Sequence, residues 1–482
     1  MNSPSTLAKL ATGVPGFDAI SHGGIPEHKA TLITGKSGVG KTILSLQVAC
    51  NLAAQGKRVL YITAEEDPED IFATGTGLGL GLEELAQQGS FQITNLTAPT
   101  EGPILVSGTY DFSALIHRVH QEVRSKGIEV VVLDSANALF VQKETEETLR
   151  SHFFQFVHGM KKLGLTTLIS TEAPSDYGPP LTKLGVEDFV CDMVIILRNV
   201  IDGEKRRRSI EIHKYRRSPH FKGQYPCTMT PRGLTIFPLE VRDPQIHSNE
   251  RFSSGIRGLD ELNHGGWLRD SIVLVRGPSG SGKTILAGTF ARAGAMRGEK
   301  VVFYGFEESK PQLMRNFGSL GITLEELERQ GTIEVVCQYP EATSPEDILV
   351  DLSSTLALYK PSLIVLDSIS SIEHATSAVG FRQFMVGIAS ILRQQGRSAL
   401  LTQAISSYKD SDYAVPYLST IADVMLDLDY TRHQGSIHRG IRVIKMRGSA
   451  HSTEERGFAI SEGGLRVEHS RSGRARSAAK KK

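Results

Sequence analysis

Cysteine and net charge are both scarce in this chain of 482 residues. Its four cysteines, Cys50, Cys191, Cys227 and Cys337, lack the spacing of a metal site, so we interpret them as reduced thiols. No apolar run reaches the roughly 18 residues that a membrane helix needs, and the N-terminus lacks the pattern of a signal peptide. The net charge of +1 argues against a broad electropositive surface for nucleic acid. We therefore expect a cytoplasmic protein without membrane contact or a nucleic-acid partner.

A phosphate-binding loop of the type G-x-x-x-x-G-K-T occurs twice. The glycines let backbone N–H groups surround phosphates, the lysine neutralises their charge, and the threonine hydroxyl can bind Mg²⁺. A chance glycine loop is the alternative, but each copy follows a strand-like run and precedes a helix-like run, which favours the P-loop. The predicted ATP-binding residues are Gly35, Lys36, Ser37, Gly38, Val39, Gly40, Lys41 and Thr42, and Gly277, Pro278, Ser279, Gly280, Ser281, Gly282, Lys283 and Thr284.

The two loops belong to a longer internal repeat. The second copy begins 242 residues after the first (277 minus 35), and the same offset relates residues 13–18 to residues 255–260. We expect an N-terminal domain over 1–240, a linker over 241–251, a second domain over 252–468, and a disordered basic tail over 469–482. Alternating strand-length and helix-length segments indicate an α/β fold in both domains, each with a mainly parallel, twisted sheet flanked by helices.

A carboxylate ends an apolar strand downstream of each P-loop. Asp134 follows Val130–Leu133, and Asp367 follows Leu363–Leu366. A carboxylate at the C-terminal edge of a parallel strand can orient Mg²⁺ and its waters, as in a Walker B sequence. Many buried strands end in Asp as a turn residue, but the upstream P-loops favour the functional interpretation.

A pair of glutamates follows each P-loop helix. Glu65 and Glu66 come 24 and 25 residues after Lys41, and Glu307 and Glu308 come equally far after Lys283. Such a carboxylate can face the γ-phosphate and accept a proton from an attacking oxygen, and the first of each pair is the better candidate base. An acidic helix N-terminus is the alternative. We expect Mg²⁺ to lie near Thr42 in the first domain and near Thr284 and Glu307 in the second.

A basic segment with the pattern K-x-R-x-S-x-H also occurs in both halves. A lysine and an arginine two residues apart on a strand point to the same side and could reach a phosphate across a subunit boundary. A solvated, charged edge strand is the alternative. The predicted nucleotide contacts in trans are Lys214, Arg216, Ser218 and His220, and Lys445, Arg447, Ser449 and His451.

Together these residues resemble KaiC, the circadian-clock ATPase and autokinase family within the RecA-like P-loop superfamily, over about residues 12–467. The resemblance implies two tandem RecA-like domains that bind ATP and Mg²⁺ and assemble into a hexameric double ring. It implies slow ATP hydrolysis in the first ring, where Glu65 and Glu66 act on water. In the second ring it implies a serine/threonine autokinase and autophosphatase with Glu307 as the base.

The resemblance also assigns the phosphoryl acceptors to Ser419 and Thr420, for which a turn or a helix cap is the alternative. Alignment of Asp192 with Asp423 places Asp188 and Phe189 opposite these hydroxyls, so only the second domain could phosphorylate itself.

The chain departs from the family pattern at two places. A further hydroxyl residue of the family falls here in residues 414–416, which are Ala-Val-Pro, and this could alter the order or reversal of phosphorylation. The tail lacks the peptide that KaiA captures, so we do not expect control by KaiA, whereas a KaiB-like partner on the first ring is implied by analogy. The alternative functions are a RecA-like ATPase that depends on nucleic acid and a scaffold in which nucleotide only joins subunits.

Overall fold

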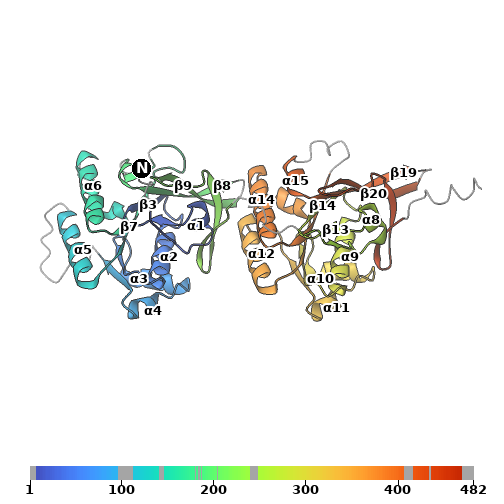
Figure 1. The fold of residues 1–482 in the computed structure, drawn as a ribbon, viewed down its shortest axis with the longest axis horizontal. Helices are drawn as coiled ribbons and strands as arrows, with labels where there is room; N and C mark the ends of the chain where they lie inside the picture. Colours follow the sequence, from blue (N-terminus) through green and yellow to red (C-terminus); the bar gives the residue numbers. More distant parts are fainter. Residues whose placement is uncertain are drawn as a thin grey trace, which may run out of the picture. The chain divides into compact units, whose positions relative to one another are not determined.

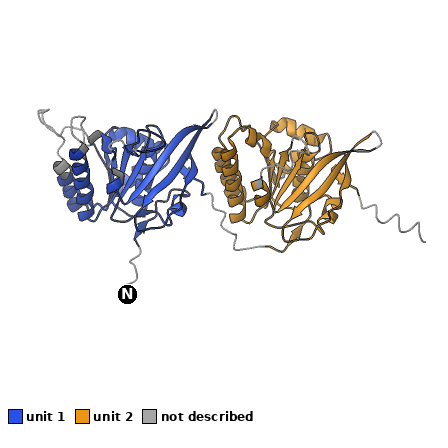
Figure 2. Cartoon of the chain, turned by 90° about the horizontal axis from the view of Figure 1, so that it is seen from above, with its two compact units in different colours: residues 1–238 blue, residues 239–482 orange. Residues whose placement is uncertain are grey.

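The computed structural model describes residues 7–95, 112–139, 146–179, 181–182, 185, 187–202, 205–238, 248–405, 416–433 and 436–468. The chain divides into two compact units, residues 1–238 and 239–482 (Figure 2). The expected basic tail, most of the expected linker, and residues 414 and 415 lie outside the described residues.

The first unit alternates strands and helices up to its last four strands (Figure 1). Its elements are β1 (Lys9–Leu10), α1 (Phe17–Ile20), β2 (Ile25–Pro26), β3 (Ala30–Gly35), α2 (Lys41–Ala54), β4 (Val59–Thr63), α3 (Pro68–Gly77), α4 (Leu82–Gln87), β5 (Phe91–Asn95), α5 (Phe112–Lys126), β6 (Val130–Asp134), the 3-10 helix Ala136–Leu139, α6 (Glu146–Lys162), β7 (Thr166–Glu172), α7 (Glu187–Val190), β8 (Met193–Asp202), β9 (Lys205–Tyr215), β10 (Gln224–Thr230) and β11 (Gly233–Ile236).

The second unit repeats this order. Its elements are β12 (Arg251–Phe252), α8 (Arg257–Leu262), β13 (Trp267–Leu268), β14 (Ile272–Gly277), α9 (Lys283–Met296), β15 (Val301–Gly305), α10 (Lys310–Gly318), α11 (Leu324–Arg329), β16 (Ile333–Cys337), α12 (Pro345–Tyr359), β17 (Leu363–Asp367), α13 (Ile369–His374), α14 (Ala378–Gln394), β18 (Ser398–Ala404), α15 (Pro416–Ile421), β19 (Val424–His433), β20 (Ser436–Met446), β21 (Arg456–Ser461) and β22 (Gly464–Val467).

The main sheets of the two units have the same topology. Among the described residues each contains nine strands, in the order β5-β4-β6-β7-β3-β8-β9-β10-β11 and β16-β15-β17-β18-β14-β19-β20-β21-β22. The first six strands of each order are parallel to one another, and the last three are added antiparallel. This confirms the predicted fold class of two tandem RecA-like α/β units, and it places the P-loop strands, β3 and β14, inside each sheet.

The strands β9 and β20, which carry the basic segments, are interior strands rather than edge strands. Each pairs on one side with β8 or β19 and on the other with β10 or β21. In the described ladders, however, β9 pairs with β10 only over residues 208–211 and β20 with β21 only over residues 439–441, so Lys214 and Lys445 lie beyond them, on strand ends paired on one side as in an edge strand. Only their ends, where the lysines and arginines lie, are left to reach other groups.

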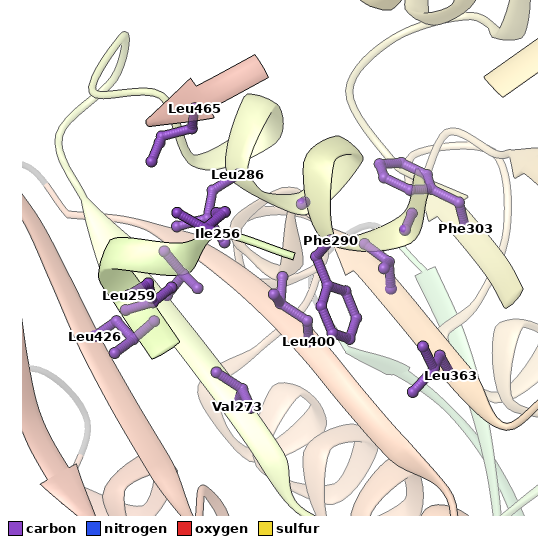
Figure 3. Packing of buried hydrophobic residues seen from close by; sticks show 14 of the residues in the cluster. Ile256, Leu259, Val273, Leu286, Phe290, Phe303, Leu363, Leu400, Leu426 and Leu465 are labelled. Carbon is purple, nitrogen blue, oxygen red and sulfur yellow. The ribbon is translucent and has the colours of Figure 1, made fainter. Parts of the chain in front are cut away.

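Both faces of each sheet are apolar because helices cover both. In the second unit α8, α9, α10 and α11 cover one face, and α12 packs against α14, while in the first unit α5 and α6 cover the face turned away from α2 (Figure 1). Figure 3 shows Leu286 and Phe290 of α9 packed over Val273 and Leu400 of the sheet. Continuous apolar runs such as Val130–Leu133 are typical of parallel strands buried on both faces. Among the described residues no helix has the length and apolar character that a membrane span requires.

Candidate nucleotide site

Each P-loop joins the end of a central strand to the start of a helix, β3 to α2 and β14 to α9. The residue before each helix is a glycine with a left-handed backbone, Gly40 at φ 106° and Gly282 at φ 105°. A Cβ on Gly40 would lie 1.9 Å from Met229 Cε, and one on Gly282 would lie 2.9 Å from Ile460 Cδ1. Glycine is therefore favoured at both positions by the backbone, and a larger residue would also displace the ends of these two side chains.

The P-loop lysines fold back over their own loops. Lys41 Nζ donates to the carbonyls of Gly35 at 3.0 Å and Lys36 at 2.9 Å. Lys283 Nζ donates to the carbonyls of Gly277 and Pro278, both at 2.9 Å. Burial lowers the pKa of each lysine, and nearby carboxylates oppose that shift: Glu172, Asp134 and Glu65 in the first unit, and Asp367 and Glu307 in the second. Each ammonium thus lies close to the predicted catalytic carboxylates.

The aspartates of the predicted Walker B strands are buried, and hydroxyl groups donate to both. Asp134 accepts hydrogen bonds from Tyr61 at 2.7 Å and from Ser170. Asp367 accepts from Thr402 at 2.5 Å and from the P-loop residue Thr284. Burial raises the pKa of Asp367 to about 6, with a smaller rise from Glu307, while the two hydroxyls and Lys283 oppose the shift.

The sequence interpretation missed these hydroxyl donors, as well as Glu172 beside Lys41. Ser170 and Thr402 lie on β7 and β18, one strand away from the aspartate that each contacts. Since they belong to no motif, their role depends on strand order. The sequence did contain a signal for the Tyr61 hydroxyl. The repeat offset of 242 aligns Tyr61 with Phe303, so the first site has a hydroxyl group where the second has none.

The two glutamates of each pair have different neighbours. Glu65 accepts a hydrogen bond from Ser135, and its charge raises the pKa of Lys41 against the lowering by burial. Glu307 accepts a hydrogen bond from Ser371 at 3.2 Å, and its charge raises the pKa of Lys283 against the lowering by burial. In the second unit Glu308 instead accepts from Asn316 of α10 at 2.8 Å. Burial, followed by the charge of Asp134, raises the pKa of Glu66. The first glutamate of each pair therefore lies on the P-loop side, where a general base would have to be.

The residues of both loops fit a triphosphate with Mg²⁺. Neither α2 nor α9 has a side-chain cap, so the first-turn N–H groups and the positive end of the helix dipole are available to an anion. The Thr284 hydroxyl and the Asp367 carboxylate lie within hydrogen-bonding distance and supply the oxygen ligands that Mg²⁺ prefers. Within the described ranges no group of three or more His, Cys, Asp or Glu side chains could hold a metal.

Ser419 and Thr420 lie near the N-terminal ends of the parallel strands, whereas their own P-loop lies at the C-terminal ends. They belong to α15, which ends at Ile421 just before β19 begins, and Asp423 N donates to the carbonyl of Ile272 at the start of β14 at 2.8 Å. The P-loop follows the other end of β14. At about 3.3 Å per residue, the six-residue strand separates the two sites by about 17 Å.

The lysines and arginines of the basic segments hold the helix that precedes the last parallel strand. Lys445 Nζ donates to the carbonyls of Ser419 and, at 2.8 Å, of Ala422, and Arg447 donates to the carbonyl of Thr420 at 2.6 Å. In the first unit Lys214 and Arg216 both donate to the carbonyl of Phe189, at 3.5 and 2.7 Å. The lysine and the arginine of each segment thus donate to the same short helix region of their own unit, although Arg216 and Arg447 lie one residue beyond the ends of β9 and β20 and not on the strands.

The serines of these segments and His220 contact residues of their own unit. Ser218 donates to the carbonyl of Pro219 at 2.9 Å, and Ser449 accepts from Arg251. The His220 ring lies 6.3 Å from the Tyr215 ring, and His451 is half-buried. All of them lie after the ends of β9 and β20, at the sheet edge away from their own P-loops.

Comparison with known proteins gives one consistent result. A family model described as "ATPase: KaiC" matches residues 10–241 and 252–472, one match in each repeat. Proteins named "Circadian clock oscillator protein KaiC" are 39% identical in Thermostichus vulcanus and 40% identical in Nostoc sp. PCC 7120, over 97% of this chain and 90% of each relative. The protein of that name from Synechococcus elongatus is 38% identical over 96% of this chain and 90% of its own length.

Proposed function

The chain belongs to the KaiC family of ATPases, and from that premise we propose that it is an ATP-dependent serine/threonine autokinase and ATPase that assembles as a homohexamer. The first unit hydrolyses ATP, with Glu65 and Glu66 acting on water. The second unit transfers the γ-phosphoryl group to Ser419 or Thr420 and later removes it, with Glu307 as the base. ATP and Mg²⁺ are the ligands of both units.

One observation supports transfer between subunits: the P-loop of the second unit and the residues Ser419 and Thr420 lie at opposite ends of strand β14. The P-loop follows the C-terminal end of β14, whereas α15 and the cations Lys445 and Arg447 lie at its N-terminal end. Because about 17 Å of strand separates them, a P-loop cannot serve the acceptors of its own chain. A head-to-tail contact between subunits brings a P-loop to the next subunit's acceptors and repeats until the ring closes.

The chemistry of the second unit follows from the groups around the P-loop. Lys283 and the uncapped start of α9 bind the phosphates, and Thr284 and Asp367 are the groups that would hold Mg²⁺, which neutralises charge on the phosphates. Glu307 accepts the proton from the attacking Ser or Thr hydroxyl as the new O–P bond forms and ADP departs. In the first unit Phe189 stands where Thr420 stands in the second, so water is the acceptor there.

Incubation with γ-labelled ATP tests the reaction. Glu307→Gln should abolish labelling of the chain because it removes the base. Glu308→Gln is the matched control and should leave most of the label, since that side chain accepts from Asn316 on α10. Replacement of both Ser419 and Thr420 by alanine should remove the label. An unlabelled wild-type chain would rule out the kinase, and label that survives the double alanine change would place the acceptor elsewhere.

A mixing experiment tests transfer between subunits. Lys283→Ala chains keep the acceptors but lose the P-loop lysine, and chains with alanine at 419 and 420 keep the P-loop but lose the acceptors. Neither should be labelled alone. After the two are mixed and allowed to exchange subunits, label should appear on the Lys283→Ala chains. Absence of label from mixed rings, with active wild type alongside, would contradict transfer in trans.

The assembly and its partners are part of the same proposal. The relatives are named as circadian clock oscillator proteins, and we propose a comparable regulatory role with a KaiB-like partner on the first unit. Mass measurement with and without ATP tests the hexamer, and a monomer under both conditions would contradict it.

A further inference from the structure

The side chain of Tyr61 distinguishes the two nucleotide sites, although it belongs to no motif. It lies on β4, next to the strand β6 that ends in Asp134, and it is fully buried. Its ring lies 6.1 Å from the Phe91 ring at an interplanar angle of 25°, and its hydroxyl donates to Asp134 Oδ2 at 2.7 Å. Ser170, on β7 at the other side of β6, donates to Asp134 Oδ1. Hydroxyls from the strands on both sides therefore hold the two oxygens of this carboxylate.

The second unit has phenylalanine at the matched position. Phe303 occupies the same register on β15, opposite Val365, as Tyr61 occupies on β4, opposite Val132. Its ring packs against Phe317 at 5.7 Å and brings no hydroxyl to Asp367. Thr402 takes the place of Ser170, and the other hydroxyl that donates to Asp367 is that of Thr284 in the P-loop.

We propose that Tyr61 is a positioning residue that presets Asp134 of the first unit for Mg²⁺ before the metal arrives. The hydroxyls of Tyr61 and Ser170 come from strands β4 and β7 of the sheet and not from the P-loop. In the second unit the partner of Asp367 is Thr284, itself expected to bind the metal. A metal held by both Thr284 and Asp367 would take the place of the hydrogen bond between them, whereas the bonds from Tyr61 and Ser170 to Asp134 involve no P-loop residue.

This inference rests on the proposed nucleotide site of the first unit and predicts different metal requirements for the two units. Loss of the Tyr61 hydroxyl should raise the Mg²⁺ concentration needed for half-maximal effect by about 3- to 10-fold, as expected for one hydrogen bond to a buried carboxylate. The KM for ATP at saturating Mg²⁺ should not change, because the Tyr61 hydroxyl donates to Asp134 and not to a phosphate-binding group of the P-loop. A residue with only a structural role would not separate these two quantities.

The test uses the full chain with Lys283→Ala, so that nucleotide binding reports on the first unit. Tyr61→Phe is compared with Tyr304→Phe, which removes a partly buried tyrosine hydroxyl of the second unit that bonds to Thr355 and so leaves the first nucleotide site unchanged. The measurement is the Mg²⁺ midpoint for binding a fluorescent, non-hydrolysable ATP analogue, followed by kcat and KM for hydrolysis. The midpoint should rise for Tyr61→Phe and stay at the parent value for Tyr304→Phe. Equal midpoints for both variants would overturn the proposal.

A reciprocal variant guards against a folding defect in Tyr61→Phe. In the full chain with Lys41→Ala, Phe303→Tyr adds the missing hydroxyl beside Asp367 and should lower the Mg²⁺ midpoint of the second unit by about threefold. An unchanged or higher midpoint would also count against the proposal. The binding assay does not depend on turnover. A parent chain that binds the analogue with Mg²⁺ but hydrolyses no ATP would refute first-unit hydrolysis and leave the role of Tyr61 to be decided by the midpoints.

Discussion

Replacing Asp367 by asparagine should stabilise the nucleotide-free second unit, and the gain should grow with pH. The pKa of this buried carboxyl is raised from 3.8 to about 6, mainly by burial. The folded state therefore holds the proton more tightly than the unfolded chain does, so the stability of the wild type falls as the pH rises from 3.8 to 6. A shift of about two units corresponds to about 3 kcal/mol above that range, and to about 1.5 kcal/mol at pH 5. Asparagine keeps the shape without this penalty.

The single tryptophan of the chain provides the assay. Trp267 is fully buried in the second unit, 5.5 Å from the Phe290 ring of α9, so its fluorescence follows unfolding of the P-loop helix and its surroundings. Urea unfolding of wild type and Asp367→Asn, without nucleotide and at one protein concentration, gives the free energy of unfolding at pH 5 and pH 7.5. The advantage of the variant should increase by about 1.5 kcal/mol between these values.

The comparison across pH removes any constant effect of the amide group. Glu341→Gln, an equivalent change at an exposed position, is the control and should show no such increase. A pH-independent difference, or one that shrinks toward pH 7.5, would refute the assignment of a burial penalty to Asp367. With Mg²⁺ and ATP present the order should reverse, because asparagine lacks the charge that favours the metal.

Two further changes test the loop and the acceptor helix. Gly282→Ala should abolish nucleotide binding by the second unit. Gly298→Ala is the control, because Gly298 also has a positive φ but has open space around its Cβ; it should lower the free energy of unfolding by about 1 kcal/mol and keep nucleotide binding. Calorimetric titration of chains in which Lys41 is replaced measures binding by the second unit alone. Replacing Lys445 and Arg447 by alanine removes the donors to the last carbonyls of α15, so amide exchange there, followed by mass spectrometry, should become about tenfold faster or more; unchanged exchange would show that these cations do not hold the helix.

The sequence was sufficient for the α/β fold because its signals are local and repeated. The apolar runs indicate strands, the helix-length segments between them indicate helices, and each P-loop indicates a strand followed by a helix. Because the sequence repeats, both halves must have the same fold. The order of strands, which decides that α15 and the P-loop lie at opposite edges, cannot be read from any local pattern. It depends on which strands pair, and β14 pairs with β18 and β19, more than 100 residues further along the chain.

The site was predicted in its motifs but not in its supporting contacts. Asp134 and Asp367 were identified from matched strand ends, yet the different hydroxyls that hold them come from β4, from β7 and β18, and from the P-loop. The basic segments could be recognised by their repetition, but not their contacts with the carbonyls of α7 and α15. Such contacts join elements far apart in sequence, and hydrogen-bonding side chains carry no periodic signal.

The P-loop and the residues Ser419 and Thr420 lie at opposite ends of β14, so the second unit has two chemically different faces. In the proposed assembly a whole reaction centre exists only where one such face meets the other face of the next subunit, so an isolated chain would hold separate halves. Dilution below the concentration at which subunits assemble would then stop phosphoryl transfer, although the residues that carry it out are unchanged. Because every polypeptide supplies one copy of each unit, both layers of such an assembly would have the same number of members.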